Sequence, residues 1–467
     1  MELLLLFIFL MLLAIIVLLS VQLHLTRKQM QLWREQWNIP VNNKSATEEG
    51  KPDNKETGGE IDTKGKGVKK EEDKSHKEKV LDSILYRKKE IGENDLPRVE
   101  KELMGYFAKY PTKDYFNDLN AKEYYRFIDL RDNPKGRVVV IGDIHCDYLS
   151  LAAALLKLSV SDYDYFGKAY FVFLGDYLDR GTALFEPLLL LMDLKRILGE
   201  RMIMLRGNHE LIAYDSQKQS IRSRVIPSQS SECLNDFCGN NKTFLEKFSY
   251  FYRTLPTYVY LKTKDKVVLL THASIPRSNN HAHITIHQNN GSIVFDDTVT
   301  VTDQLNIRNM ILHDMVWGDP KEVEEKIQCD GRFEFGSKQF DQFVLQNHID
   351  LMIRSHEEVP IGYKAFFGKR LYTLFSTGGE KNPQTGYPNV EPAFAVVQNQ
   401  NCYFENSYIY QKNIDGKRFF ANLFSNIAYT EAQIENCKLN EEFLCDEVTW
   451  GKVKSIMKEV RSGFSDN

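Results

Sequence analysis

Polar side chains that can bind metal ions follow three short apolar runs in the first half of the chain. Asp143 and His145 come after the run 137–141, Asp176 after the run 171–174, and Asn208 after the run 202–205. Asp143 and Asp176 are 33 positions apart, and Asp176 and Asn208 are 32 apart, which is the length of one strand–helix–strand unit. The runs predict parallel strands whose ends bring carboxylates, an imidazole and an amide into one pocket, which suits two divalent metals.

Two histidines extend this set to five strand ends. His272 follows the predicted strand 266–270, and His356 follows the predicted strand 349–353. Mixed carboxylate, imidazole and amide ligands favour Mn, Fe or Zn over Ca or Mg alone. Two such ions about 3.5–4 Å apart can share a carboxylate and a water, activate that water and hold the oxygens of an in-line displacement at phosphorus. Asp176, in the middle unit, is the natural bridge.

Each of these residues taken alone has a structural interpretation. Asp143 or Asp176 could cap the N-terminus of a helix, and His209, the residue after Asn208, could be a buried core histidine. Six metal-ligand residue types at five successive strand ends favour a metal site over these alternatives.

The intervening segments predict the elements that position these side chains. Residues 149–158 and 184–198 are predicted as crossover helices between parallel strands. Residues 244–255 are predicted as an amphipathic helix, and residues 371–375 and 393–397 as further strands. The predicted fold class is α/β.

Three sequence blocks resemble the signature of the phosphoprotein phosphatase family of calcineurin-like metallophosphoesterases. They are GDIHCD (142–147), GDYLDRG (175–181) and LRGNHE (205–210). Four later blocks occur in the family's order, namely HASIP (272–276), HDMVWGDP (313–320), IRSHEEVPIGY (353–363) and LFSTGG (374–379). The resemblance extends over residues 134 to 400.

The resemblance implies a β-sandwich of two mixed sheets flanked by helices, with two divalent or trivalent metal ions (Mn, or Fe and Zn) at the sheet edge. It assigns one metal to Asp143, His145 and Asp176, and the other to Asp176, Asn208, His272 and His356. It also implies that His209, oriented by Asp179, protonates the leaving alkoxide, and that Arg180 binds the phosphate oxygens. Arg332, in a block with altered spacing, is the implied second phosphate-binding arginine.

The sequence departs from the family pattern at three places. Cys146 replaces the usual glycine, which makes it either an oxidation-sensitive point or a tolerated substitution. The family's His-Gly-Gly is replaced by His272-Ala273-Ser274, and the substrate-groove loop of the animal enzymes by residues 376–379. These departures predict that the chain belongs to a divergent branch of the family, closer to its bacterial-like members than to the main eukaryotic signalling phosphatases.

Composition narrows the class of protein. The 467 residues carry a net charge of -4, and 42% of them are hydrophobic. This balance argues against nucleic acid as a partner, because nucleic-acid-binding proteins usually present a basic surface. The seven scattered cysteines include no CxxC pair, so neither a zinc ribbon nor a disulfide framework is expected.

The N-terminal sequence predicts a membrane anchor. The apolar run 3–19 is long enough to span a bilayer, and Arg27, Lys28 and Arg34 on its C-terminal side predict a single-pass protein with a cytosolic catalytic domain. The alternative is a cleaved signal peptide and a secretory lumen, but no basic residue precedes the run and no small-x-small site follows it.

Five segments are therefore expected along the chain. They are a transmembrane anchor (1–25), a juxtamembrane segment and disordered charged linker (26–80), a helical preface (81–133), the catalytic domain (134–410) and a C-terminal extension (411–467).

The predicted function is hydrolysis of phosphoserine and phosphothreonine in proteins by a metal-bridging hydroxide, with His209 as the general acid. One alternative is hydrolysis of a nucleotide such as diadenosine tetraphosphate, or of polyphosphate, because relatives with these blocks cleave such substrates. A second alternative is a membrane scaffold that binds phosphoproteins with little catalysis.

Overall fold

The computed structural model describes residues 74–109, 124–278, 282–326, 332–379, 382–407, 409–412, 418–421, 444–445 and 447–462. Residues 73–466 form one compact unit, which contains all of these ranges.

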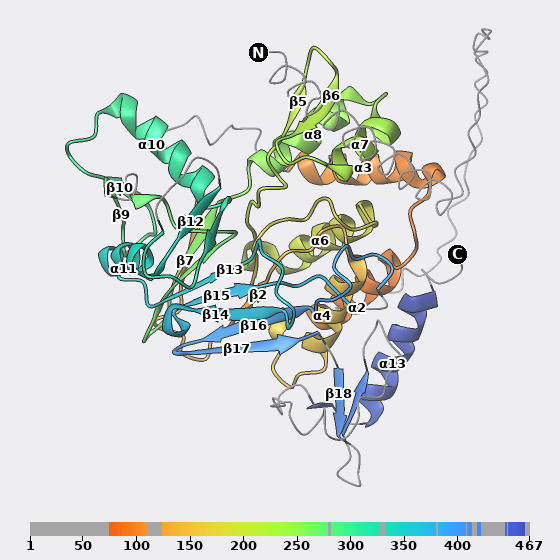
Figure 1. The fold of residues 1–467 in the computed structure, drawn as a ribbon. Coiled ribbons are helices and arrows are strands. Elements are labelled where there is room, and N and C mark those ends of the chain that lie inside the picture. The colour runs from red at the N-terminus through yellow and green to blue at the C-terminus, as the bar shows by residue number, and fades with distance from the viewer. Residues whose placement is uncertain are drawn as a thin grey trace, which may run out of the picture. The chain divides into compact units, whose positions relative to one another are not determined.

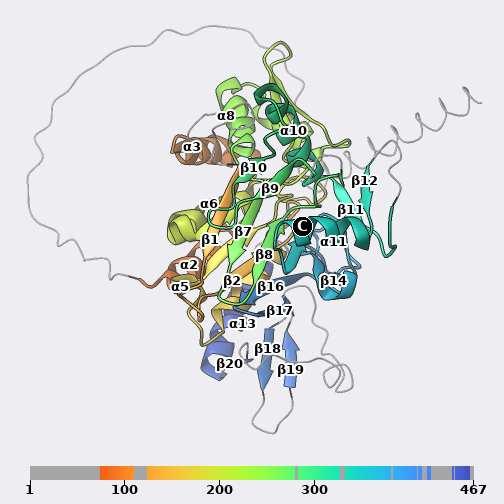
Figure 2. The same cartoon turned by 90° about the vertical axis from the view of Figure 1, so that its left-hand side faces the viewer.

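Two mixed sheets form the centre of this unit (Figure 1). The five-stranded sheet has the order β17 (Asn401–Asn406), β16 (Ala393–Gln398), β2 (Val138–Ile141), β3 (Tyr170–Phe173) and β4 (Met202–Met204). The six-stranded sheet has the order β1 (Tyr125–Asp129), β7 (Tyr258–Lys262), β8 (Val267–Thr271), β13 (Leu351–Arg354), β15 (Leu371–Leu374) and β14 (Tyr363–Phe366). Figure 2 shows β1, β7 and β8 side by side.

Alternation along β2 explains why the two sheets pack face to face. Val138 and Val140 pack with Val259 and Leu270 of the other sheet in the core between the two sheets. Val139 and Ile141, which point to the opposite face, pack in the core with the helices. The strand is buried on both faces, so its sequence is a continuous apolar run.

Helices cover both outer faces of this sandwich. Those in the core beside the five-stranded sheet are α2 (His76–Arg87), α3 (Leu96–Phe107), α4 (Tyr148–Ser159), α5 (Tyr165–Lys168), α6 (Phe185–Leu198), α7 (Gln229–Cys238), α8 (Lys242–Arg253) and α13 (Glu447–Ser462). The helices α10 (Val301–Asp314) and α11 (Ser337–Gln346) pack on the six-stranded sheet. The predicted crossover helices 149–158 and 184–198 are confirmed as α4 and α6.

Short strands form four small sheets. These are β5 (Ile212–Asp215) with β6 (Ser220–Ser223), β9 (Ile284–Ile286) with β10 (Ile293–Phe295), β11 (Gly318–Pro320) with β12 (Phe333–Phe335), and β18 (Ile409–Lys412) with β19 (Arg418–Ala421) and β20 (Leu444–Cys445).

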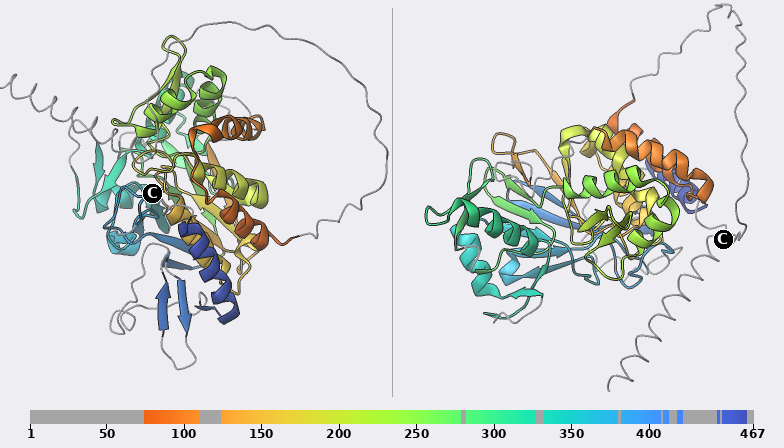
Figure 3. Two further views of the ribbon diagram at one scale, coloured as in Figure 1. Left: turned by 90° about the vertical axis from the view of Figure 1, so that its right-hand side faces the viewer. Right: turned by 90° about the horizontal axis from the view of Figure 1, so that it is seen from above.

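The structure places three elements differently from the predicted segments. Helix α2 begins within the predicted linker, because Ser75 and Glu78 form a capping box. Strand β1 lies within the predicted helical preface and pairs with β7. Helix α13, within the predicted extension, packs beside α2 and buries Ile456 and Val460 in the same core (Figure 3).

The predicted localisation requires a correction. Across the ranges that the structure describes, no helix is both long and apolar enough to cross a membrane, so the prediction of a single-pass membrane protein is wrong for this part of the chain. The predicted anchor, residues 1–25, lies outside the described residues.

Candidate metal centre

The six predicted ligands lie at one edge of the sandwich. The five-stranded sheet contributes Asp143, His145, Asp176 and Asn208 after β2, β3 and β4, and the six-stranded sheet contributes His272 and His356 after β8 and β13. Three of the six have left-handed backbones, with φ of 46° at His145, 51° at Asp176 and 77° at His356. Such conformations cost about 1–3 kcal/mol each and cluster at functional sites, where the surrounding fold maintains them.

The first cluster consists of Asp143, His145 and Asp176, all almost completely buried. Nε2 of His145 lies 3.5 Å from a carboxylate oxygen of Asp143 and 3.6 Å from one of Asp176. Nδ1 of His145 lies 2.9 Å from the Leu178 carbonyl oxygen, which can only accept. The ring therefore donates through Nδ1 and turns Nε2 toward the two carboxylates.

The second cluster shares Asp176 with the first. Nε2 of His272 lies 3.0 Å from Oδ1 of Asn208, 3.1 Å from Nδ1 of His356 and 3.4 Å from Oδ1 of Asp176. Nδ1 of His272 is 3.1 Å from the Leu174 carbonyl oxygen, so this ring also presents Nε2 to the cluster. The ligand atoms of Asp176, His272 and His356 all lie within 4.8 Å of one another.

Two observations test whether these residues fit metal ions. Oδ2 of Asp143 is buried and has no hydrogen-bond partner. Oδ1 of Asn208 faces the nitrogens of His272 and His356 and the carboxylate of Asp176, so either its amide is turned to donate to them or a cation lies among them. Buried acceptors converging in this way suit cations, and mixed oxygen and nitrogen donors suit Mn, Fe or Zn. The residues therefore fit two metal ions that share Asp176.

The pKa shifts in the two clusters also indicate that positive charge is favoured there. Burial opposes protonation of His145, but Asp143 and Asp176 outweigh it and raise its pKa to about 9. Burial likewise opposes protonation of His272, yet Asp176 raises its pKa. Burial raises the pKa of Asp176, but the three neighbouring imidazoles lower it overall. Metal ions compete with protons for these same donor atoms.

His209 and Asp179 form a pair beside the two clusters. Nδ1 of His209 lies 2.6 Å from Oδ2 of Asp179, and its ring packs edge-on against His145 with centroids 4.8 Å apart. Oδ1 of Asp179 accepts from the Ser228 hydroxyl at 3.0 Å and from the Ser230 amide at 2.8 Å. Burial alone would raise the pKa of Asp179, but these hydrogen bonds lower it, so this carboxylate stays ionised and fixes the His209 ring.

The two predicted phosphate-binding arginines occupy different surroundings. Arg180 is exposed, and its backbone amide donates to Oε1 of Gln229 at 3.4 Å. Arg332 contacts Nε2 of His356 and forms an ion pair with Asp319 at 2.6 Å. The structure therefore brings Arg332 to the edge of the second cluster despite the altered spacing of its sequence block.

Glu210 is a site residue that the sequence reasoning did not single out, although it ends the LRGNHE block. Its buried carboxylate accepts from the amides of Asp176, Tyr177 and Gly207 at 2.8–2.9 Å, which fixes the loop that carries Asp176. A Cβ atom at Gly207 would lie 2.1 Å from Oδ1 of Asp176, so only glycine fits there.

Tyr387 is a second residue that the sequence reasoning missed, because no motif contains it. Its ring lies beside His145 with centroids 5.4 Å apart and packs edge-on against Phe375 at 4.9 Å. The loop before it is fixed by the Thr182 amide, which donates to the Gln384 carbonyl oxygen at 3.0 Å. Tyr387 thus forms an aromatic wall next to the first cluster.

Cys146 has a buried side chain and a left-handed backbone, with φ of 53°. This conformation gives a physical reason for a glycine at the position, since glycine adopts it without strain. Burial raises the pKa of the thiol. Little thiolate forms in such a site, which favours a tolerated substitution over an oxidation-sensitive point.

Comparison with known proteins finds similarity in the central part of the chain. Residues 136–360 match the family of calcineurin-like phosphoesterases. A probable serine/threonine-protein phosphatase of Encephalitozoon cuniculi is 28% identical over 253 residues, which cover 53% of this chain and 49% of that protein. The chain thus spans about half the length of this curated relative.

Two solved structures are similar to this chain in part. A protein serine/threonine phosphatase from Saccharomyces cerevisiae with similarity to human phosphatase PP5 is 17% identical, with a TM-score of 0.45, over 76% of this chain and 91% of its own. A cold-active protein tyrosine phosphatase is 15% identical, with a TM-score of 0.40, over 66% of this chain and 82% of its own. The family match and the name of the curated relative agree with the predicted enzyme class, a phosphatase.

Proposed function

We propose that this chain hydrolyses phosphoserine and phosphothreonine in proteins, using two metal ions held by the clusters that share Asp176. The observation that carries the proposal is the position of the His209–Asp179 pair directly beside those clusters. The curated relative is named as a probable serine/threonine-protein phosphatase, which supports this substrate class over other phosphoesters.

The metal ions would be held by Asp143, His145 and Asp176 on one side, and by Asp176, Asn208, His272 and His356 on the other. When bound, such ions supply an activated water and positive charge at the phosphoryl oxygens. The protein's own part is to hold these side chains in the orientation that metal binding requires. The hydrogen bonds from His145 and His272 to backbone carbonyl oxygens support this role, because they fix both imidazole rings.

His209 is proposed as the general acid. Asp179 accepts from Nδ1 of His209, so the ring presents Nε2 to the side where Asp176 lies, 3.9 Å away. A proton on Nε2 can pass to the seryl or threonyl oxygen as its bond to phosphorus breaks. A positioned acid of this kind contributes about 10²–10⁴-fold in rate.

Arg180 and Arg332 are proposed to bind the non-bridging phosphate oxygens. Arg332 is held against His356 by Asp319, which lies between Arg332 and the buried Arg354. A guanidinium fork matches the geometry of a phosphate, and orienting the phosphate lowers the entropic cost of reaching the transition state.

The test is a substrate panel on one purified, Mn-supplemented preparation. Phosphoserine and phosphothreonine peptides should be hydrolysed faster than diadenosine tetraphosphate or polyphosphate, and His209→Asn should abolish most of this activity. Faster cleavage of a nucleotide or polyphosphate would overturn the substrate class. Tight binding of phosphopeptides without turnover would instead indicate a binding protein.

A further inference from the structure

The segment between β15 and β16 crosses from the six-stranded sheet to the five-stranded sheet at the edge where the metal ligands lie. It starts at Phe375, which pairs with the backbone of Asp143 in an isolated parallel bridge. The structure describes residues 376–379 and 382–392 of it, which we call the crossing loop. Tyr387 of this loop lies beside His145, so the loop borders the first cluster.

One buried carboxylate holds the crossing loop. Asp147 is completely buried, and its Oδ2 accepts hydrogen bonds from the Thr377 hydroxyl at 2.7 Å and from the side-chain amide of Asn382 at 2.8 Å. Asp147 also caps helix α4, because it accepts from the amide of Ser150 at 3.0 Å and from its hydroxyl at 2.5 Å. A helix cap needs a single acceptor oxygen, so the two bonds to the crossing loop give this side chain a further role.

Two hydroxyl groups extend this contact along the crossing loop. The hydroxyl oxygens of Thr377 and Thr385 lie 3.0 Å apart. Because Thr377 donates its one hydroxyl proton to Asp147, the proton between the two threonines comes from Thr385. The Thr385 oxygen in turn accepts from the amide of Tyr387 at 3.1 Å. Asp147 is thereby linked through two threonines to the backbone at Tyr387.

The crossing loop packs backbone to backbone against the segment that carries Arg180. The Thr182 amide donates to the Gln384 carbonyl oxygen at 3.0 Å. A Cβ atom at Gly386 would lie 2.8 Å from the Arg180 carbonyl oxygen, and one at Gly181 would lie 2.6 Å from the Gln384 carbonyl oxygen. Only glycine permits so close an approach, so a shift of the crossing loop would also shift the segment beside it.

Arg180 depends on its surroundings because its backbone is strained. The φ angle is 70° at Arg180 and 66° at Asp179, both in the left-handed region, which such residues keep only where the fold maintains it. On the side of α7, the Arg180 amide donates to Gln229 and the Asp179 amide to the Ser230 hydroxyl. Among the described residues no side chain pairs with the exposed Arg180 guanidinium, so its backbone determines where it can reach.

We propose that Asp147 is a positioning residue for phosphate binding. By holding the crossing loop, it keeps the strained backbone of Asp179 and Arg180 in the conformation that directs the Arg180 guanidinium to the phosphate. The inference rests on the proposed function, in which Arg180 binds the phosphate oxygens.

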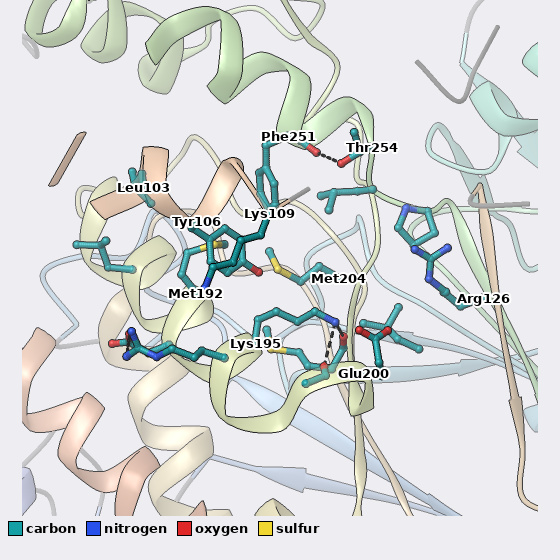
Figure 4. Close-up of a pocket in the computed structure, with 18 of the residues that line it drawn as sticks. Leu103, Tyr106, Lys109, Arg126, Met192, Lys195, Glu200, Met204, Phe251 and Thr254 are labelled. Atoms are coloured by element: carbon teal, nitrogen blue, oxygen red, sulfur yellow. Dashed lines mark hydrogen bonds and ion pairs between the residues drawn. The ribbon is translucent and has the colours of Figure 1, made fainter. Parts of the chain in front are cut away.

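Thr377→Val separates this role from the capping of α4. It removes the hydroxyl that joins the crossing loop to Asp147, keeps nearly the same shape and leaves the bonds between Asp147 and Ser150 intact. Thr254→Val is the matched control. Figure 4 shows Thr254, also a buried threonine, with its hydroxyl donating to the Phe251 carbonyl oxygen at 2.7 Å, beside a cavity that no candidate metal-centre residue lines.

The experiment measures binding of inorganic phosphate to the whole purified, Mn-loaded chain by calorimetry, and phosphopeptide kinetics on the same preparations. Thr377→Val and Asp147→Asn should each weaken phosphate binding about tenfold and raise KM by a similar factor, with a much smaller change in kcat. Thr254→Val should change neither quantity. In an Arg180→Ala background, Thr377→Val should weaken phosphate binding no further, because it acts through Arg180.

Metal content and melting temperature are measured for each variant, and the metal content should stay that of the wild type. Four results would overturn the proposal. They are additive losses from Arg180→Ala and Thr377→Val, phosphate affinity that Arg180→Ala leaves unchanged, loss of metal in Thr377→Val, and a lowered melting temperature of Thr377→Val with unchanged phosphate affinity. The last result would leave the crossing-loop contacts a purely structural role.

Failure of the proposed function gives a different result. Faster cleavage of a nucleotide or polyphosphate than of phosphopeptides would contradict the proposed substrate class. The loss of phosphate binding in Thr377→Val is measured without any substrate, so it would still support the role of Asp147.

Discussion

In the helical layer of α2, α3 and α6, the buried Arg87 lies between two carboxylates, Asp193 and Glu102, each within 2.5–2.8 Å. At the metal-centre edge, by contrast, Asp143, Asp176 and Glu210 are equally buried, but within the described ranges no lysine or arginine lies within 4.0 Å of them. Their neighbours are imidazoles and backbone amides. Isolated charges are costly to bury. The carboxylates of the helical layer are neutralised by arginines of the chain, whereas those of the metal centre suit bound metal ions.

The largest effect should come from Asp176, which both clusters share. Asp176→Asn should lower kcat/KM at least about 10³-fold, because it weakens both metal sites and each ion contributes several kcal/mol of transition-state stabilisation. It should lower the melting temperature of the metal-free chain at neutral pH, because the neighbouring imidazoles lower the pKa of Asp176 and so stabilise its ionised form in the folded state. Enzyme assays, metal analysis and thermal unfolding measure this, and full metal content in the variant would contradict it.

His209→Asn should separate acid catalysis from metal binding. The rate should fall about 10²–10⁴-fold while the metal content stays that of the wild type, since His209 donates a proton and holds no ion in this proposal. The activity loss should shrink for a substrate with a good leaving group, such as an aryl phosphate, which needs less protonation. Equal losses on alkyl and aryl phosphates would argue against the role of general acid.

Arg87→Ala should lower the stability of the fold and leave catalysis almost unchanged. Removing the guanidinium leaves the buried Asp193 without its main partner, so the free energy of unfolding should fall by about 3–5 kcal/mol. The kcat/KM of the folded enzyme should stay close to that of the wild type. Arg98→Ala, which removes a half-exposed partner of the same Glu102, is the control and should cost at most about 1 kcal/mol.

Glu186 is an exception in the helical layer and gives the smallest expected effect. One carboxylate oxygen accepts from the Ile91 amide, the other has no partner, and burial raises its pKa from 4.5 to about 7. Below about pH 4.5, Glu186 is protonated in both the folded and the unfolded state. Above about pH 7 it is ionised in both states, and its buried charge then destabilises the folded state to the full extent. Glu186→Gln should therefore gain stability relative to the wild type as pH rises through this window, by about 3 kcal/mol in total. A difference that does not vary with pH would contradict this.

The sequence was sufficient to bring Asp143, His145, Asp176 and Asn208 together, because these four residues follow strands of consecutive strand–helix–strand units. The spacing of Asp143, Asp176 and Asn208 follows from parallel strands joined by right-handed crossovers, and α4 and α6 are those crossovers. The strands themselves were visible as apolar runs because both faces are buried. The capping box of Ser75 and Glu78 follows a Ser-x-x-Glu sequence pattern, but the charged composition around it led to the prediction of a linker there.

The sequence alone thus determined which residue types could bind metal, which strands carry most of them and, through the resemblance, the kind of reaction. The tertiary structure decided which strands pair within each sheet and which side chains from distant segments lie next to one another. Only it places β1 beside β7 and Tyr387 beside His145. The physical reason is that periodicity records which face of each element is buried, whereas the partner of that face is chosen by packing between segments far apart in the chain.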